Sequence, residues 1–156
     1  MTDITLALGG GGIKGIAHIG VLRVLEQAGF TIKAIAGTSA GGLIGSIYAY
    51  GKTPDEIEDI ALNLNQSKLF NRGKDEGPSL MGLSGITDAL SQHLGDATFD
   101  DLKIPFACTA VDTKTMQEYI LNRGRVATAV LATIAVPGIF SPQFIGNTEL
   151  VDGGIL

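Results

Sequence analysis

Two glycine-rich junctions, each between an apolar run and a helical pattern, constrain this chain more than any other feature. Residues 4–8 and residues 32–36 are short apolar runs, and each stops at a glycine segment. Apolar residues at helical spacing follow in residues 16–25 and 40–50. This order of strand, helix, strand and helix predicts a right-handed parallel βαβ unit, and hence an α/β fold with a mainly parallel sheet.

Capping signals and further periodic segments continue this alternation. Thr53, Pro54 and Glu56 supply an N-cap, a first-turn proline and a capping-box acid for a helix that reaches about residue 65. Residues 66–85 then lose periodicity but keep several apolar side chains. We expect the remaining elements to be helices at 86–94 and 126–135, strands at 104–111 and 117–121, and two short extended pieces within 143–151.

One ordered domain over residues 1–156 is expected from the composition, because 45% of the residues are hydrophobic and only 17% are charged. The net charge of −5 offers no basic face to nucleic acid or to anionic membranes. The start, MTDITLALGGGG, carries an acid where a signal peptide needs basic residues. The apolar stretch 40–50 is shorter than the ~20 residues of a membrane span, so a cytoplasmic location is expected.

The segment Gly37-Thr38-Ser39-Ala40-Gly41 is a G-x-S-x-G motif between a predicted strand and a predicted helix. This is the context of a nucleophile elbow, in which small residues such as Gly37 and Gly41 let the strand and helix backbones approach closely. Ser39 would stand at the helix N-terminus, where the helix dipole and the backbone N–H of Ala40 favour negative charge. The alternative is a glycine-rich turn that contains a serine by chance.

The segment GGGGIKG, residues 9–15, is the other strand-to-helix junction. Its glycines allow several backbone N–H groups to converge, as an oxyanion hole requires. In a parallel sheet this loop and the elbow lie at the same edge. The glycines also spell the G-x-G-x-x-G of a dinucleotide site, but the acid expected after the second strand is missing, and Ile16 replaces the lysine of a Walker A loop. Nucleotide binding is therefore not expected.

A serine nucleophile needs a base, and the chain has only two histidines, His18 and His93. His18 lies in a predicted helix, where a histidine most often packs or hydrogen-bonds, and His93 lies near a helix C-terminus, where it can interact with the dipole. Asp152 is the better candidate, because the glycines that follow it let the backbone close tightly around its carboxylate. By itself, Asp-Gly-Gly is most often a turn. The single cysteine, Cys108, lies in an apolar run and is expected to be an inert packing residue.

Taken together, GGGGIKG, GTSAGG and VDGG resemble the patatin-like phospholipase family in their order, with similar intervening text such as AHIGVLRVL and VPGIF. The resemblance covers residues 4–154 and implies the three-layer α/β/α fold of that family with a Ser-Asp dyad. The residues that match are Ser39 for the nucleophile, Asp152 for the base, Gly10, Gly11 and Gly12 for the oxyanion loop, and Lys14 for a basic residue that supports this loop.

The sequence departs from the family pattern at two places. Family members usually continue after Asp-Gly-Gly with a further strand and helix, whereas this sequence stops at Leu156. The resemblance thus implies a domain that lacks the usual C-terminal part, with a dyad geometry that is poorly held. The other departure is Thr133, which follows Ala132 where an alanine-serine pair is common, and it is expected to have little consequence.

The sequence predicts a serine acyl-ester hydrolase, of the lipid acyl hydrolase or phospholipase A-like esterase kind, that needs neither cofactor nor metal. A lipid substrate also allows peripheral contact with a membrane. Two alternatives stay open: a catalytically silent truncated domain that binds lipid or a partner protein, and an acyltransferase that uses the same acyl-serine. The apolar residues within 66–85, Leu80 and Met81 among them, either line an acyl pocket or pack as a loop on their own domain.

Overall fold

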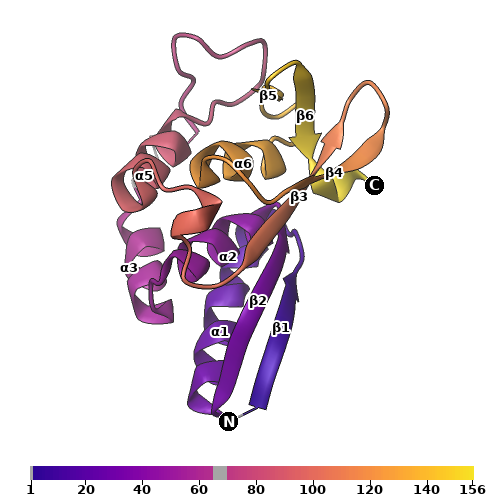
Figure 1. Cartoon of the computed structure of the whole chain (residues 1–156). Coiled ribbons are helices and arrows are strands. Elements are labelled where there is room, and N and C mark those ends of the chain that lie inside the picture. Colours follow the sequence, from indigo (N-terminus) through magenta and orange to yellow (C-terminus); the bar gives the residue numbers. More distant parts are fainter. Residues whose placement is uncertain (1, 65–69) are drawn as a thin grey trace.

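A six-stranded mixed sheet forms the frame of the computed structural model, which describes residues 2–64 and 70–156 (Figure 1). Three neighbouring strands are parallel: β1 (Thr2–Leu8), β2 (Phe30–Thr38) and β3 (Phe106–Asp112). The other pairings are antiparallel, with β4 (Gln117–Leu121) and β6 (Thr148–Asp152) on β3, and β5 (Gln143–Ile145) on β6.

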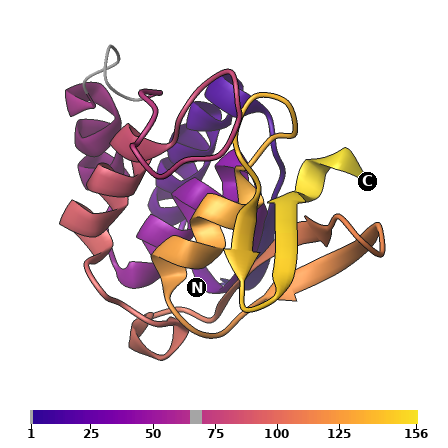
Figure 2. The ribbon, with the colours of Figure 1, turned by 90° about the horizontal axis from the view of Figure 1, so that it is seen from above.

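The helices gather on one side of the sheet when the molecule is seen from above (Figure 2). Right-handed crossovers between neighbouring parallel strands place successive helices on the same face. The predicted α/β fold with a mainly parallel sheet is confirmed, because four of the six strands, β1, β2, β3 and β5, run in the same direction and helices pack on the sheet. The helices that contact strands are α1 (Ala17–Gln27), α2 (Ala40–Tyr50) and α6 (Val126–Thr133), whereas α3 (Pro54–Asn63) packs on α1 and α2, and α5 (Ser84–Leu94) on α2 and α6.

Three predicted helix bounds differ from the structure. The helix expected from residue 16 begins at Ala17, after a 3-10 turn, η1 (Gly12–Ile16), whose first residue Gly12 has a φ of 55°. The helix predicted at 126–135 ends at Thr133, since Pro137 lacks an N–H and disfavours helical geometry in the residue before it. The third helix, predicted to reach about residue 65, ends at Asn63, because Leu64 takes an extended conformation with a ψ of 124°. Residues 65–69, with the start of the following loop, lie outside the described residues.

The core lies between the sheet and the helices. Leu22 of α1, Ile57 of α3 and Leu150 of β6 are among its fully buried side chains. A smaller cluster of apolar residues joins α5 to α6, and its buried members are Leu90, Leu94, Val126 and Val130. Within residues 2–64 and 70–156, every helix is too short or too polar to cross a membrane.

Two strands, β2 and β6, share one edge of β3 and meet there end to end. Because β4 occupies one edge of β3 along residues 108–112, β2 and β6 must both lie on the other edge. Thr38, the last residue of β2, pairs with Thr109, and Asp152, the last residue of β6, pairs with Ala110. Neighbouring Cα atoms in a strand are about 3.8 Å apart. The carboxyl ends of β2 and β6 therefore come together.

We predict that Gly41→Ala lowers the free energy of unfolding by about 3 kcal/mol or more, because overpacking a closed contact forces the backbone to move. A Cβ on Gly41 would lie 2.0 Å from the carbonyl oxygen of Leu8. The matched control is Gly20→Ala in α1, where a Cβ would meet no atom within 4 Å. This control should raise the free energy of unfolding by about 0.5–1 kcal/mol. Denaturant unfolding measures both, and equal effects would contradict the close contact.

Candidate active site

Ser39 occupies a strained turn between β2 and α2. Its φ of 53° and ψ of −123° are values that a side-chain-bearing residue adopts only under constraint, at a cost of about 1–3 kcal/mol. The flanking glycines make the turn possible, since a Cβ on Gly37 would lie 2.6 Å from the carbonyl oxygen of Gly41. The turn therefore presents the serine at the N-terminus of α2, as a nucleophile elbow does.

The glycine loop between β1 and η1 lies beside this serine. A Cβ on Gly10 would lie 3.2 Å from the Cβ of Ser39 and 3.9 Å from its Oγ. Gly11 and Gly12 have φ values of 154° and 55°, so the loop takes a path that side-chain-bearing residues rarely follow. The loop and the serine thus share one small region.

The loop also packs against the first turn of α2. A Cβ on Gly15 would lie 2.2 Å from the Cβ of Ala40. The first N–H groups of a helix, here beginning with that of Ala40, have no acceptor within the helix and carry the positive end of its dipole. An anion that develops next to Ser39 would meet these donors.

Lys14 contacts the glycine loop through its backbone. Its N–H donates to the carbonyl oxygen of Gly11 at 3.1 Å, which closes the turn into η1. Its side chain is exposed, and within the described part of the chain it makes no hydrogen bond or ion pair. Support of the loop by Lys14 is therefore a backbone effect in this structure.

Asp152 is held at the end of β6 with only 3% of its surface exposed. Its N–H donates to the carbonyl oxygen of Ala135 at 2.9 Å, and its Oδ1 accepts a hydrogen bond from the N–H of Gly154 at 2.7 Å. Gly153 must be a glycine because a Cβ there would lie 2.4 Å from Oγ1 of Thr109. These contacts close the backbone around the carboxylate.

The shared edge of β3 brings Ser39 and Asp152 to the same place, although they lie far apart in the sequence. In the described residues no hydrogen bond joins the Ser39 hydroxyl to the Asp152 carboxylate. One carboxylate oxygen, Oδ1, is already engaged by Gly154. Catalytic hydrogen bonds are often long or poorly aligned before substrate binds and tighten in the reacting complex.

Thr133 is a site residue whose contacts the sequence alone did not reveal, and the expectation that a threonine here in place of a serine has little consequence stays a prediction. Its hydroxyl accepts a hydrogen bond from the backbone N–H of Ser39 at 2.9 Å and donates one to the carbonyl oxygen of Thr109 at 2.6 Å. The side chain is fully buried. A threonine at the end of an alanine-rich helix was the one available signal, because a buried hydroxyl needs partners.

Among the described residues, neither histidine is hydrogen-bonded to the Ser39 hydroxyl. Nε2 of His18 lies 2.8 Å from the carbonyl oxygen of Gly9, so this nitrogen carries the proton and donates to the glycine loop. His93 lines a hollow with Tyr50 and Gly51, at the other end of α2. Because α2 has 11 residues, that end is about 16 Å from Ser39.

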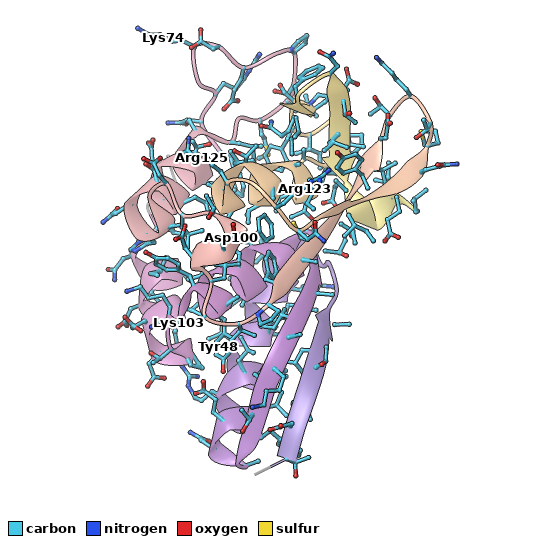
Figure 3. All side chains as sticks on the ribbon, in the orientation of Figure 1. Tyr48, Lys74, Asp100, Lys103, Arg123 and Arg125 are labelled. Atoms are coloured by element: carbon cyan, nitrogen blue, oxygen red, sulfur yellow. The ribbon has the colours of Figure 1, made fainter. Side chains whose placement is uncertain are left out.

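This hollow has a volume of about 900 Å³, and Ser39 is not among its lining residues. Lys103, which also lines it, extends over Gly51 at the C-terminus of α2 (Figure 3). Within residues 2–64 and 70–156, no group of three or more His, Cys, Asp or Glu side chains is placed to hold a metal ion.

The described part of the apolar loop, residues 70–83, packs on the segment that follows α6. The N–H of Met81 donates to the carbonyl oxygen of Ile139 at 2.9 Å, and the rings of Phe70 and Phe140 lie 5.8 Å apart. Lys74 marks the outer part of this loop (Figure 3). Two apolar side chains of the loop stay exposed, Leu80 at 81% and Met81 at 41%, while its backbone and Phe70 pack on the segment after α6.

Comparison with known proteins identifies one family and several relatives. The profile of a family described as patatin-like phospholipase matches residues 6–156. An uncharacterized NTE family protein of Mycobacterium tuberculosis is 36% identical over 98% of this chain, which spans 43% of that relative. Lysophospholipase nte1 of Emericella nidulans is 28% identical over 98% of the chain and 10% of its own length. The chain thus spans less than half the length of these relatives.

Solved structures share the fold at low sequence identity. VipD from Legionella pneumophila superposes with a TM-score of 0.72 at 14% identity, over 99% of this chain and 46% of VipD. The type III effector ExoU superposes with a TM-score of 0.61 at 18% identity, over 88% of this chain and 41% of ExoU. At these identities the likeness concerns the fold.

We predict that Cys108 does not react with a thiol reagent at pH 8 while the chain is folded. The side chain is fully buried, and burial raises the pKa of its thiol to about 12. In the unfolded chain the thiol pKa is ~8.5, so the unfolded state loses the proton first and the free energy of unfolding should fall as the pH rises above that value. Colorimetric thiol titration with and without denaturant checks this, and stoichiometric labelling of the folded chain would contradict it.

Proposed function

This chain belongs to the patatin-like phospholipase family, and we propose that it hydrolyses acyl esters of lipids with Ser39 as nucleophile and Asp152 as base. One observation carries the proposal: a strained serine and a buried carboxylate stand at the ends of two strands that share one edge of β3. No other pair in the described residues combines these two properties beside a glycine loop.

The proposed reaction begins when the Ser39 Oγ attacks the ester carbonyl carbon and its proton passes to the Asp152 carboxylate. The tetrahedral intermediate collapses, the alcohol leaves with the proton from Asp152, and an acyl-serine remains. A water molecule then attacks the acyl-serine while Asp152 takes its proton. The second intermediate releases the fatty acid and returns the proton to Ser39.

The oxyanion in both intermediates would be stabilised by backbone N–H groups of the loop Gly10, Gly11 and Gly12 and by that of Ala40. Support comes from the contact of Gly10 with Ser39 and from the packing of Gly15 on Ala40, which bring the loop and the start of α2 to one side of the serine. Such donors are fixed before the reaction, so they stabilise developing charge without reorganising.

Two neighbouring functions remain compatible with the same residues. An acyltransferase would pass the acyl group from Ser39 to an alcohol in place of water. A silent domain that binds lipid or a partner protein is favoured by one observation, namely that the described side chains show no direct hydrogen bond between Ser39 and Asp152. A chromogenic short-chain ester assay separates the silent domain from the other two, and product analysis with added alcohol separates those.

Peripheral contact with a membrane is part of the proposal, because the ester bonds of phospholipids lie at the lipid surface. Apolar side chains stand exposed on η1, on the loop before α5 and on the segment after α6: Ile13 at 79%, Leu80 at 81% and Ile139 at 38%. A cytoplasmic location stays a prediction from the sequence.

We predict that Ser39→Ala abolishes turnover and labelling by a serine-directed phosphonate, and that Asp152→Asn removes nearly all turnover because the proton then has no acceptor. The double change His18→Gln and His93→Ala should retain most turnover. The glutamine amide can still donate to Gly9, but it cannot act as a base. Ester hydrolysis across pH 5–9 measures all three variants.

The histidine result decides between two mechanisms. A Ser-His-Asp triad would show an acidic limb near the imidazole pKa of ~6.5, and loss of the histidines would be nearly as damaging as loss of the serine. If the folded double histidine variant hydrolyses no ester while Asp152→Asn still does, the Ser-Asp dyad is wrong. Circular dichroism of each variant confirms that it is folded.

We predict that Leu80→Ser with Met81→Ser weakens hydrolysis of long-chain esters more than that of short-chain esters. Each methylene contact removed should cost up to ~0.8 kcal/mol. The matched control is Leu62→Ser in α3, which removes a side chain that is 76% exposed on a helix packed against α1 and α2. kcat/KM across a series of chain lengths measures the effect, and a uniform loss would exclude an acyl-binding role.

A further inference from the structure

The C-terminal end of α6 contacts both members of the proposed dyad. Thr133, its last residue, accepts a hydrogen bond from the backbone N–H of Ser39 at 2.9 Å. Ala135, two residues later, accepts one from the backbone N–H of Asp152 at 2.9 Å. A single short segment thus fixes two residues that lie on different strands and far apart in the sequence.

The Thr133 hydroxyl acts both as an acceptor and as a donor, in each case with a backbone group. It accepts from Ser39 and donates to the carbonyl oxygen of Thr109 at 2.6 Å. Thr109 lies on β3 and pairs with Thr38, the residue before the serine. The hydroxyl therefore links α6, the serine turn and the edge of β3 that β2 and β6 share.

The methyl group of Thr133 fits the start of α2. A Cβ on Gly42 would lie 2.7 Å from Cγ2 of Thr133, so the missing side chain of this glycine makes room for the methyl group. The threonine is fully buried, and its hydroxyl has partners on both sides. The space beside Gly42 takes the methyl group and the two backbone partners orient the hydroxyl, so the Thr133 side chain fits in a single orientation.

We propose that Thr133 is a positioning residue, whose hydroxyl fixes the backbone of Ser39 in its strained conformation relative to Asp152. This inference rests on the proposed function and adds the residue that sets the geometry of the dyad. Thr133 takes no part in proton transfer, since its hydroxyl bonds the N–H of Ser39 and not the Oγ. It acts by keeping the nucleophile where the base and the oxyanion donors meet the substrate.

The test replaces Thr133 with valine, which keeps the shape and removes the hydroxyl. A nucleophile displaced by about 1 Å loses about 10²-fold in rate, so kcat of Thr133→Val should fall by about this factor while KM stays within about twofold. The rate of phosphonate labelling at Ser39 should fall in parallel. Thr133→Ser keeps the hydroxyl and should recover most of kcat.

The matched control is Ser46→Ala. Ser46 is also fully buried, lies in α2 and donates its hydroxyl to the carbonyl oxygen of Leu43 at 2.8 Å. This variant removes a buried hydrogen bond from the helix that begins at Ser39 without touching the serine. Its kcat per folded protein should stay near that of the parent, even where its melting temperature falls.

Hydrogen exchange of the Ser39 backbone amide, measured by NMR, reports directly on its hydrogen bond to the Thr133 hydroxyl. The amide should be protected in the parent chain and in Thr133→Ser, and it should lose protection in Thr133→Val. An unprotected Ser39 amide in the parent would overturn the proposal without any variant. The proposal would also be overturned if Thr133→Val and Ser46→Ala had equal kcat values, or if Thr133→Val changed only KM.

Failure of the proposed function gives a different result. In that case the parent chain neither turns over esters nor reacts with the phosphonate, while the amide measurement still decides whether Thr133 holds the serine turn. If Thr133→Val does not fold, the parent and Thr133→Ser amide data decide in the same way.

Discussion

The close approach of α2 to the ends of β1 and β2 is the constraint on which the rest of the structure depends. Any side chain on Gly41 would collide with the carbonyl oxygen of Leu8, and any side chain on Gly37 would collide with the backbone of α2. This contact puts the first turn of the helix, the glycine loop and Ser39 in one place. The N–H groups that a helix leaves unpaired at its start then point to the region where chemistry on the serine would create negative charge.

The site lies between the N-terminal end of α2 and the C-terminal end of α6. Strand β3 contacts both sides of it. The carbonyl oxygen of Thr109 accepts a hydrogen bond from Thr133, whose hydroxyl also bonds the N–H of Ser39, and Ala110 pairs with Asp152. The strain of about 1–3 kcal/mol in a turn such as that of Ser39 is of the same order as two hydrogen bonds at ~1 kcal/mol each. The Thr133 hydroxyl supplies two such bonds.

The parts of the site that sequence reasoning could predict are local ones. The glycine loop and the Ser39 turn each consist of an apolar run, glycines and a helical pattern within about a dozen residues, so short-range geometry suffices to place them. The position of β6 could not be predicted, because it depends on pairing with a strand far away in the sequence and on which edge of β3 stays free. The contacts of Thr133 could not be predicted for the same reason, since only the tertiary fold shows which groups its hydroxyl bonds. The 3-10 turn η1 was missed because periodicity does not report the positive φ of Gly12.

The end-to-end meeting of β2 and β6 also orders events during biosynthesis. A ribosome delivers residues from the N-terminus, so the β1-α1-β2-α2 unit with Ser39 is made well before Asp152. Until β6 pairs with Ala110, the edge of β3 beside the serine turn is vacant. A half-made chain would therefore hold Ser39 in its strained turn before the carboxylate of Asp152 is present.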